Sequence, residues 1–117
     1  MPTNILANNQ VREYVNDRRP FKNNNGTMFT VLSTYRHDLY VVYSYGEHYP
    51  MYVYDCIAKQ WFGNNSESSV ATQRHLTQAR PDGDITWASK DYLRALVIAG
   101  SYANYAAQTV LREREAA

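Results

Sequence analysis

The sequence has little of what builds covalently linked, metal-held or membrane-spanning folds. It contains one cysteine, Cys56, so no disulfide can close within the chain, and we expect a reducing, cytoplasmic environment. No apolar signal region opens it, and its longest apolar run, residues 96–100, is far shorter than the ~20 residues of a transmembrane helix. We therefore predict a soluble single domain, residues 1–117, that folds around an ordinary hydrophobic core.

An excess of either charge is also missing. Twelve Lys and Arg against eleven Asp and Glu give a net charge of +1, which argues against a strongly basic nucleic-acid-binding protein and against an acidic nucleic-acid mimic. Basic residues still gather locally in an N-terminal arm, residues 1–25, where a nucleic acid could contact Arg12, Arg18, Arg19 and Lys22.

Recognisable catalytic and metal-binding patterns are absent. His37, His48 and His75 are scattered, and none has another ligand type at a spacing that a helix or hairpin would turn into a metal site. No serine stands in a Gly-x-Ser-x-Gly turn, and no glycine-rich loop leads from a strand into a helix to hold a phosphate. We therefore predict that the protein is not an enzyme and uses no metal and no cofactor.

Tyrosine is what the sequence has in excess. Eleven of the 117 residues are tyrosine, and most of them lie in residues 35–54 among β-branched residues, a composition that favours strands. Short polar connections predict an antiparallel meander within residues 27–63, and Pro50 lies where a strand can begin but not continue. Alternate positions of the second strand are apolar on both sides, so we expect both faces of the sheet to be covered. The predicted strands are residues 27–35, 39–45, 51–56 and, more briefly, 60–62, with connections at residues 36–38 and 46–48.

Two helices are predicted after the sheet. Ser68 or Ser69 can cap a short helix over residues 69–80, which Pro81 ends. After a brief extended piece, residues 85–87, Ser89 is a good cap for a long helix over residues 90–115. The predicted fold class is thus α+β: an antiparallel three- to four-stranded meander packed against a long C-terminal helix, with a short helix between.

The predicted long helix suggests self-association. Its polar residues lie on one narrow stripe, so its apolar arc is too wide for a helix that only covers a sheet. A second copy of the chain would cover the remainder, which predicts a homodimer; alternatively, the N-terminal arm and the short helix cover it. The predicted self-association residues recur at steps of four and three: Tyr92, Leu96, Ala99, Ala103, Ala106 and Val110.

Tyrosines of the sheet and donors of the short helix are candidates for binding a partner. A tyrosine suits a half-covered face, and the arginines and histidine of the helix suit an anion or an acidic protein patch. Both groups also have an ordinary structural role, as cross-strand packing and as a polar surface helix. The candidate partner-binding residues are Tyr40, Tyr43, Tyr45, Tyr52, Tyr54, Arg74, His75, Gln78 and Arg80.

Three segments carry a resemblance to a known group of proteins. They are YVVYSYG at residues 40–46, YPMYVYD at residues 49–55 and TQRHLTQARP at residues 72–81. Over residues 36–81 the chain resembles a family of small accessory proteins from tailed bacteriophages. The resemblance implies no catalytic residue. It implies a cytoplasmic protein of the infected host cell that binds and inhibits a host or defence protein, as anti-CRISPR proteins do.

Two other functions remain open on the sequence. One is nucleic-acid binding by the basic residues of the N-terminal arm together with stacking tyrosines. The other is a sponge that buries a nucleotide-like small molecule at the interface between two copies.

Overall fold

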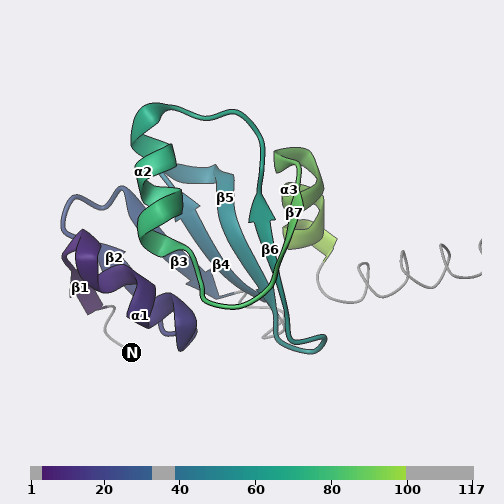
Figure 1. The fold of residues 1–117 in the computed structure, drawn as a ribbon, viewed down its shortest axis with the longest axis horizontal. Helices are drawn as coiled ribbons and strands as arrows, with labels where there is room; N and C mark the ends of the chain where they lie inside the picture. The colour runs from purple at the N-terminus through teal and green to yellow at the C-terminus, as the bar shows by residue number, and fades with distance from the viewer. Residues whose placement is uncertain (1–3, 33–38, 100–117) are drawn as a thin grey trace, which may run out of the picture.

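In the part of the chain that the structure describes, the fold is built on one mixed sheet of seven strands, which lie in the sheet in the same order as in the sequence (Figure 1). The computed structural model describes residues 4–32 and 39–99. The central strands β2 to β6 pair antiparallel, whereas β1 with β2 and β6 with β7 pair parallel. The strands are β1 (Asn4–Leu6), β2 (Phe21–Asn23), β3 (Met28–Leu32), β4 (Leu39–Ser44), β5 (Gly46–Asp55), β6 (Gln60–Asn64) and β7 (Ile85–Ala88).

Helices cover both faces of the sheet, in three layers. The short helix η1 (Asn8–Gln10) and α1 (Val11–Asn16) connect β1 to β2, and α2 (Val70–Ala79) connects β6 to β7. A parallel pair requires such a crossover. Helices α1 and α2 contact each other and lie on one face, while α3 (Lys90–Ala99) lies on the other, against β5 and β6 (Figure 1).

Because successive side chains of the central strands point to opposite faces of the sheet, the core consists of two clusters, one on each face. Tyr40 and Val42 of β4 face α1 and α2, whereas Val41 and Tyr43 face the α3 side. Every residue of β4 is buried. The prediction that both faces of the sheet are covered is therefore confirmed.

The connection between β4 and β5 is shorter than predicted. Residues 46–48 belong to β5, and the turn is the single residue Tyr45, whose φ of 66° lies in a region that bulky residues rarely adopt. Pro50 lies inside β5 opposite Tyr43, where the register shifts, because proline cannot donate to a regular ladder.

The predicted fold class is wrong. The sheet has seven strands with two parallel pairs, and α3 is described over 10 residues, so a three- to four-stranded meander on a long C-terminal helix does not describe it. Within the predicted N-terminal arm, the described residues form β1, η1, α1 and β2 and so contribute two strands to the sheet. The predicted helix residues 100–115 lie outside the described residues.

The helix starts are confirmed. The Ser69 hydroxyl accepts from the Thr72 N–H and caps α2, and the Ser89 hydroxyl accepts from the Tyr92 N–H at the start of α3. Such caps satisfy amide groups that have no partner within the helix. In the described part of the chain, no helix is both long and apolar enough to cross a bilayer.

Candidate binding surface

A row of aromatic rings with an arginine at each end lies between the α1 and α2 layer and strands β5 to β7. Tyr54 and Trp61 have ring centroids 4.9 Å apart, and Tyr52 lies 6.5 Å from Trp61 and 6.2 Å from Trp87. The guanidinium of Arg18 lies 4.7 Å from the Tyr54 ring centroid, and that of Arg80 lies 5.5 Å from the Trp87 centroid. We call these six residues, Arg18, Tyr54, Trp61, Tyr52, Trp87 and Arg80, the arginine–aromatic row.

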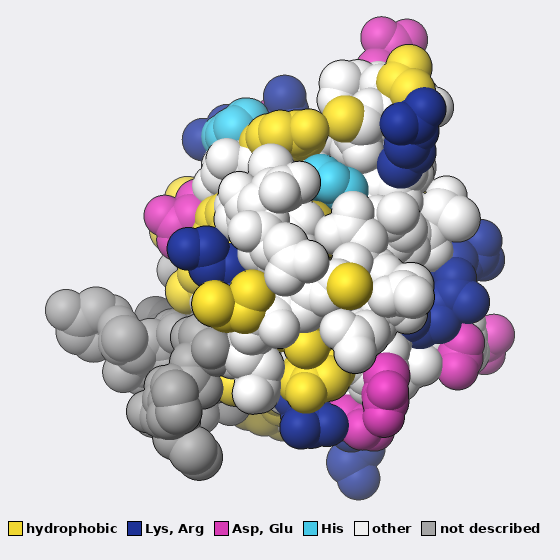
Figure 2. All heavy atoms as spheres, turned by 90° about the vertical axis from the view of Figure 1, so that its left-hand side faces the viewer, with side chains coloured by type: hydrophobic (Ala, Val, Ile, Leu, Met, Phe, Trp, Pro, Cys, Tyr) yellow, Lys and Arg dark blue, Asp and Glu magenta, His cyan; other side chains and the backbone are white. Residues whose placement is uncertain are grey.

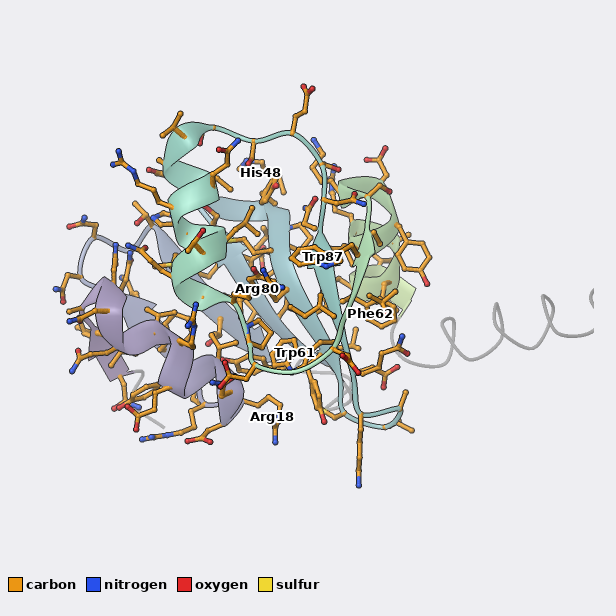
Figure 3. All side chains as sticks on the ribbon, viewed as in Figure 1. Arg18, His48, Trp61, Phe62, Arg80 and Trp87 are labelled. Atoms are coloured by element: carbon orange, nitrogen blue, oxygen red, sulfur yellow. The ribbon has the colours of Figure 1, made fainter. Side chains whose placement is uncertain are left out.

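The row has a buried floor and exposed ends. Tyr52 and Trp61 are buried, whereas Trp87 keeps 43% of its surface exposed and both arginines are exposed. Figure 3 shows Arg80, Trp61 and Trp87 in the space between α2 and β7, with Arg18 beyond the end of α1. A planar guanidinium held over a ring is a cation–π contact, which orients the charge without neutralising it.

Strand pairing places the exposed tryptophan. Trp87 pairs with Gly63 in the parallel β6–β7 register, and its ring lies directly over that glycine. A Cβ atom added at Gly63 would lie 2.6 Å from Trp87 Cζ3, well inside a normal contact. Gly63 therefore leaves room for the ring to lie against the sheet backbone and reach Tyr52.

The end of α1 places the other arginine. Arg18 has a φ of 51°, and its N–H donates to the Val15 carbonyl as the helix ends. The buried Tyr40 hydroxyl donates to the Arg19 carbonyl at 2.7 Å, which ties this turn to the sheet. The turn then directs the Arg18 guanidinium to Tyr54, where it also donates to the Asn16 carbonyl.

A second polar cluster lies under α2. Ser44 Oγ is 2.8 Å from His75 Nδ1 and 3.0 Å from Thr72 Oγ1, and the Tyr45 ring stacks on the His75 ring at 5.4 Å. Burial lowers the pKa of His75, which favours the neutral ring. A serine beside a histidine suggests a nucleophile, but Ser44 is 1% exposed, so no substrate reaches its hydroxyl in this arrangement. The cluster fastens α2 to the end of β4.

Several tyrosines predicted to bind a partner are buried. Tyr40, Tyr43 and Tyr52 are each 3% exposed or less, and burial raises the pKa of all three, to about 12 for Tyr43 and Tyr52. The Tyr52 hydroxyl donates to the Leu76 carbonyl at 2.5 Å. Tyr45 is exposed above His75, and Tyr54 is half-buried in the row.

The donors predicted on the short helix do not converge. His75 faces the sheet, Arg80 reaches Trp87, and Arg74 and Gln78 line a shallow hollow of about 340 Å³ on the outer side of α2. The Gln78 Oε1 atom is buried and meets no hydrogen-bond donor among the described residues. The structure therefore separates a set that the sequence treats as one site.

The basic residues of the N-terminal arm also separate. The Arg12 guanidinium donates to the Thr77 carbonyl, and the Arg19 guanidinium lies 4.1 Å from the Tyr14 ring centroid. Lys22 pairs with Phe29 and faces the opposite side of the sheet. Figure 2 views the left-hand side of Figure 1 and shows uncharged polar side chains, backbone and scattered hydrophobic side chains across its middle, with basic and acidic groups at its margins.

The predicted self-association residues are only partly described. Leu96 is buried against the sheet, while Tyr92 is 42% exposed with its ring 6.1 Å from that of Phe62. The side chain of Ala99 and all of Ala103, Ala106 and Val110 lie outside the described residues. Self-association through this segment stays a prediction.

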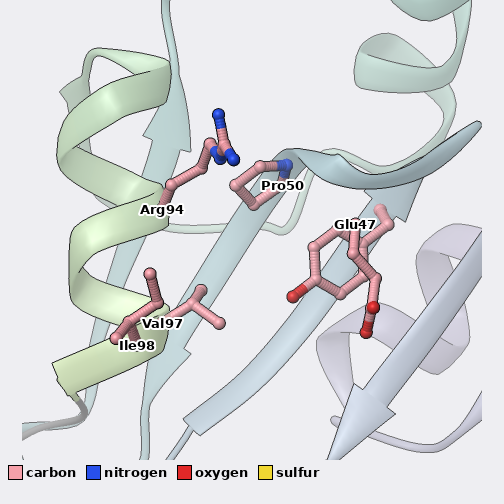
Figure 4. A pocket seen from close by; sticks show the side chains of 6 residues that line it. Glu47, Pro50, Arg94, Val97 and Ile98 are labelled. Atoms are coloured by element: carbon pink, nitrogen blue, oxygen red, sulfur yellow. The ribbon is translucent and has the colours of Figure 1, made fainter.

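Two further hollows are weaker candidates for a ligand-binding site. One, of about 220 Å³, lies beside α3 and brings Glu47 and Arg94 to its rim around Tyr43, Pro50, Val97 and Ile98 (Figure 4). It is smaller than the ~300 Å³ at which ligand pockets begin. The other, of about 580 Å³, is open, and its lining includes Ile5, Lys22 and Phe29. It has one charged side chain and no set of polar groups aimed at a common point.

Comparison with known proteins adds no relative. No family model, no curated protein and no solved structure matches the chain. Within the described residues, no group of three or more His, Cys, Asp or Glu side chains could hold a metal ion. The arginine–aromatic row is therefore the arrangement that carries the functional argument.

Proposed function

We propose that the protein is a non-catalytic binding protein that docks a partner protein on the arginine–aromatic row. The observation that carries the proposal is that both end residues, Arg18 and Arg80, are exposed and held over aromatic rings. Tryptophan, tyrosine and arginine are the residues that most often dominate interface energy. A guanidinium that a ring already orients loses less side-chain entropy when a partner binds.

The resemblance to phage accessory proteins suggests the kind of partner. A host or defence protein, as for anti-CRISPR proteins, is consistent with a small domain whose recognition residues are arginine and aromatic rings. Of the residues first proposed from the sequence, Tyr54 and Arg80 are accessible members of the row, and Tyr52 forms part of its floor.

The test compares two arginine variants of the whole chain. Arg18→Ala with Arg80→Ala removes both charges of the row, while Arg74→Ala removes an exposed arginine from the outer side of α2. Proteins captured from host lysate by the unaltered chain are identified, and the Kd of the purified partner is measured calorimetrically. We expect the double variant to lose about 2 kcal/mol, or roughly 30-fold in Kd, and Arg74→Ala to bind unchanged. Equal binding by all three chains would refute the proposal.

Nucleic-acid binding is the second candidate, because aromatic rings with arginines also stack bases. A salt titration separates the two. Affinity for a single-stranded oligonucleotide that falls linearly in log–log form with salt, and that needs Arg18 and Arg80, would favour it. The net charge of only +1 favours a protein partner instead.

A further inference from the structure

Strand β7 ends the sheet, and one side of it has no strand partner in the described part of the chain. The Ala88 carbonyl accepts from the Asn65 N–H on the β6 side. The N–H and C=O of one strand residue point to the same side, and the side alternates along the strand. The backbone groups of Thr86 therefore also face β6, whereas those of Ile85 and Trp87 face outward.

This edge is only four residues long, but within β7 no charge, proline or bulge blocks edge pairing. The strand reads Ile-Thr-Trp-Ala, with no charged residue and no proline, and no irregularity interrupts its register with β6. Proteins commonly blunt an exposed edge with lysine, proline or a bulge. An open, uncharged edge with an exposed tryptophan is a template for another strand.

We propose that β7 pairs antiparallel with β7 of a second copy of this chain, around a two-fold axis at Thr86. In that register Ile85 and the partner's Trp87 exchange their outward N–H···O=C bonds, and Trp87 does the same with the partner's Ile85. Only a two-fold axis at Thr86 pairs the outward-facing backbone groups of both Ile85 and Trp87 with outward-facing groups of β7 in the other copy. The interface uses the same strand on both copies, as a two-fold dimer requires.

The side chains suit that register. Trp87 lies directly opposite the partner's Ile85 on the α1 and α2 side, an aromatic and β-branched pair that stabilises sheets. Thr86 meets the partner's Thr86 on the α3 side, where Gln60 Nε2 donates to its hydroxyl at 3.0 Å. Cross-strand threonine pairs are also favourable.

The charges at the two ends of β7 favour a second copy of the chain as the partner and favour antiparallel pairing. Asp82 and Asp84 precede β7, and Lys90 follows it. Antiparallel pairing brings each acidic end to the partner's Lys90, whereas parallel pairing would set like ends side by side. Asp91 lies in the first turn of α3, where a carboxylate suits the positive end of the helix dipole.

A charge exchange at Thr86 tests both the dimer and its register. Thr86→Lys and Thr86→Glu each place two like charges together at the two-fold axis, so each full-length variant alone is expected to dimerise at least ten-fold more weakly than the unaltered chain in sedimentation equilibrium. An equimolar mixture is expected to restore dimers, which native mass spectrometry resolves as heterodimers. Thr77→Lys, an exposed threonine on α2, is the matched control and is expected to dimerise normally. A monomeric unaltered chain, or a dimer indifferent to Thr86→Lys, overturns the proposal.

Disulfide formation provides a second measurement, which does not depend on whether the charged variants fold. Opposed residues of a non-hydrogen-bonded antiparallel pair have Cα atoms about 4.5 Å apart, within disulfide range. In a chain carrying Cys56→Ser, we expect Thr86→Cys to form a covalent dimer on mild oxidation. Thr77→Cys in the same background is expected to stay monomeric. Equal cross-linking of the two variants contradicts the register.

Discussion

Gly63 in β6 is where the Trp87 ring touches the sheet backbone, and replacing it by alanine tests that contact. A Cβ atom there would lie 2.6 Å and 2.7 Å from two ring carbons of Trp87 and 2.8 Å from Ile85 Cγ2. Carbon atoms pack at about 3.5–4.0 Å, so the ring must move by about 1 Å. We expect Gly63→Ala to displace Trp87 from Tyr52 and to loosen the β6–β7 pair.

The magnitude follows from two opposing effects. Forcing an extra methyl group into a packed site costs about 1–3 kcal/mol. Replacing glycine within a strand recovers about 0.5–1 kcal/mol of backbone entropy. The net prediction is that Gly63→Ala lowers the free energy of unfolding by about 1–2 kcal/mol, measured by urea denaturation with tryptophan fluorescence and circular dichroism.

A double-mutant cycle with Trp87→Ala attributes the cost to the ring. Once the indole is removed, Gly63→Ala should cost about 1 kcal/mol less, because only the Ile85 contact remains. Contacting residues show such coupling, whereas independent residues add. If Gly63→Ala leaves the urea midpoint unchanged, or lowers the free energy of unfolding equally with and without Trp87, the Trp87 ring does not lie against Gly63.

Two further predictions concern the fastening of α2 to the sheet. Tyr52→Phe removes the hydroxyl that donates to the Leu76 carbonyl. We expect the free energy of unfolding to fall by about 1–2 kcal/mol in urea titrations, with an unchanged m-value. An unchanged urea midpoint would mean that water replaces the hydroxyl. Burial lowers the pKa of His75 below its ordinary 6.5, so the unfolded chain takes up a proton at a higher pH than the folded chain does. The free energy of unfolding is therefore at its full value above pH 6.5 and falls as the pH drops towards the folded-state pKa, by at most about 1.4 kcal/mol per pH unit. Denaturation midpoints between pH 7.5 and 5.5 should show this loss in the unaltered chain and less of it in His75→Gln, and equal slopes would assign the effect to other groups.

The central strands were predictable because their signal is strong and local. Strands β3, β4 and the second half of β5 each have a run of β-branched and aromatic residues long enough to stand out, and they lie where the sequence places them. Strand β6 begins at residue 60 as predicted, whereas β5 begins at Gly46 rather than at residue 51. The edge strands have no such run. Asn23 is the first residue of an Asn-Asn-Asn-Gly run, which is typical of a turn. In the structure it ends β2 and is buried, with its side chain bonded to Asn8, Thr27 and the Met28 N–H. Partners contributed by three other positions make that burial possible, and a local pattern does not reveal them.

The row was predictable only in part, for a related reason. The sequence indicates Tyr54 and Arg80 as residue types that bind partners, but it gives no reason to place Trp61 near Trp87. They approach because α2 returns the chain so that β7 pairs parallel with β6. The sequence predicts extended backbone at residues 60–62 and 85–87, but it does not indicate that the two segments pair. A parallel pair depends on the crossover between its strands, and no hairpin turn announces it.

The two proposals meet at Trp87 but can be tested apart, because neighbouring residues of β7 face opposite sides of the sheet. Trp87 faces α1 and α2 and belongs to the row, while Thr86 faces α3 and would lie on the two-fold axis. Antiparallel pairing keeps the α1 and α2 layers of both copies on one side, so the dimer would present two rows to one partner surface. Thr86→Lys should then reduce binding to an immobilised, multivalent partner through lost avidity while leaving the Kd for a monovalent partner unchanged. Arg18→Ala with Arg80→Ala should reduce both and leave the dimer intact. A variant pair that changed the two properties together would mean that the row and the edge are a single site.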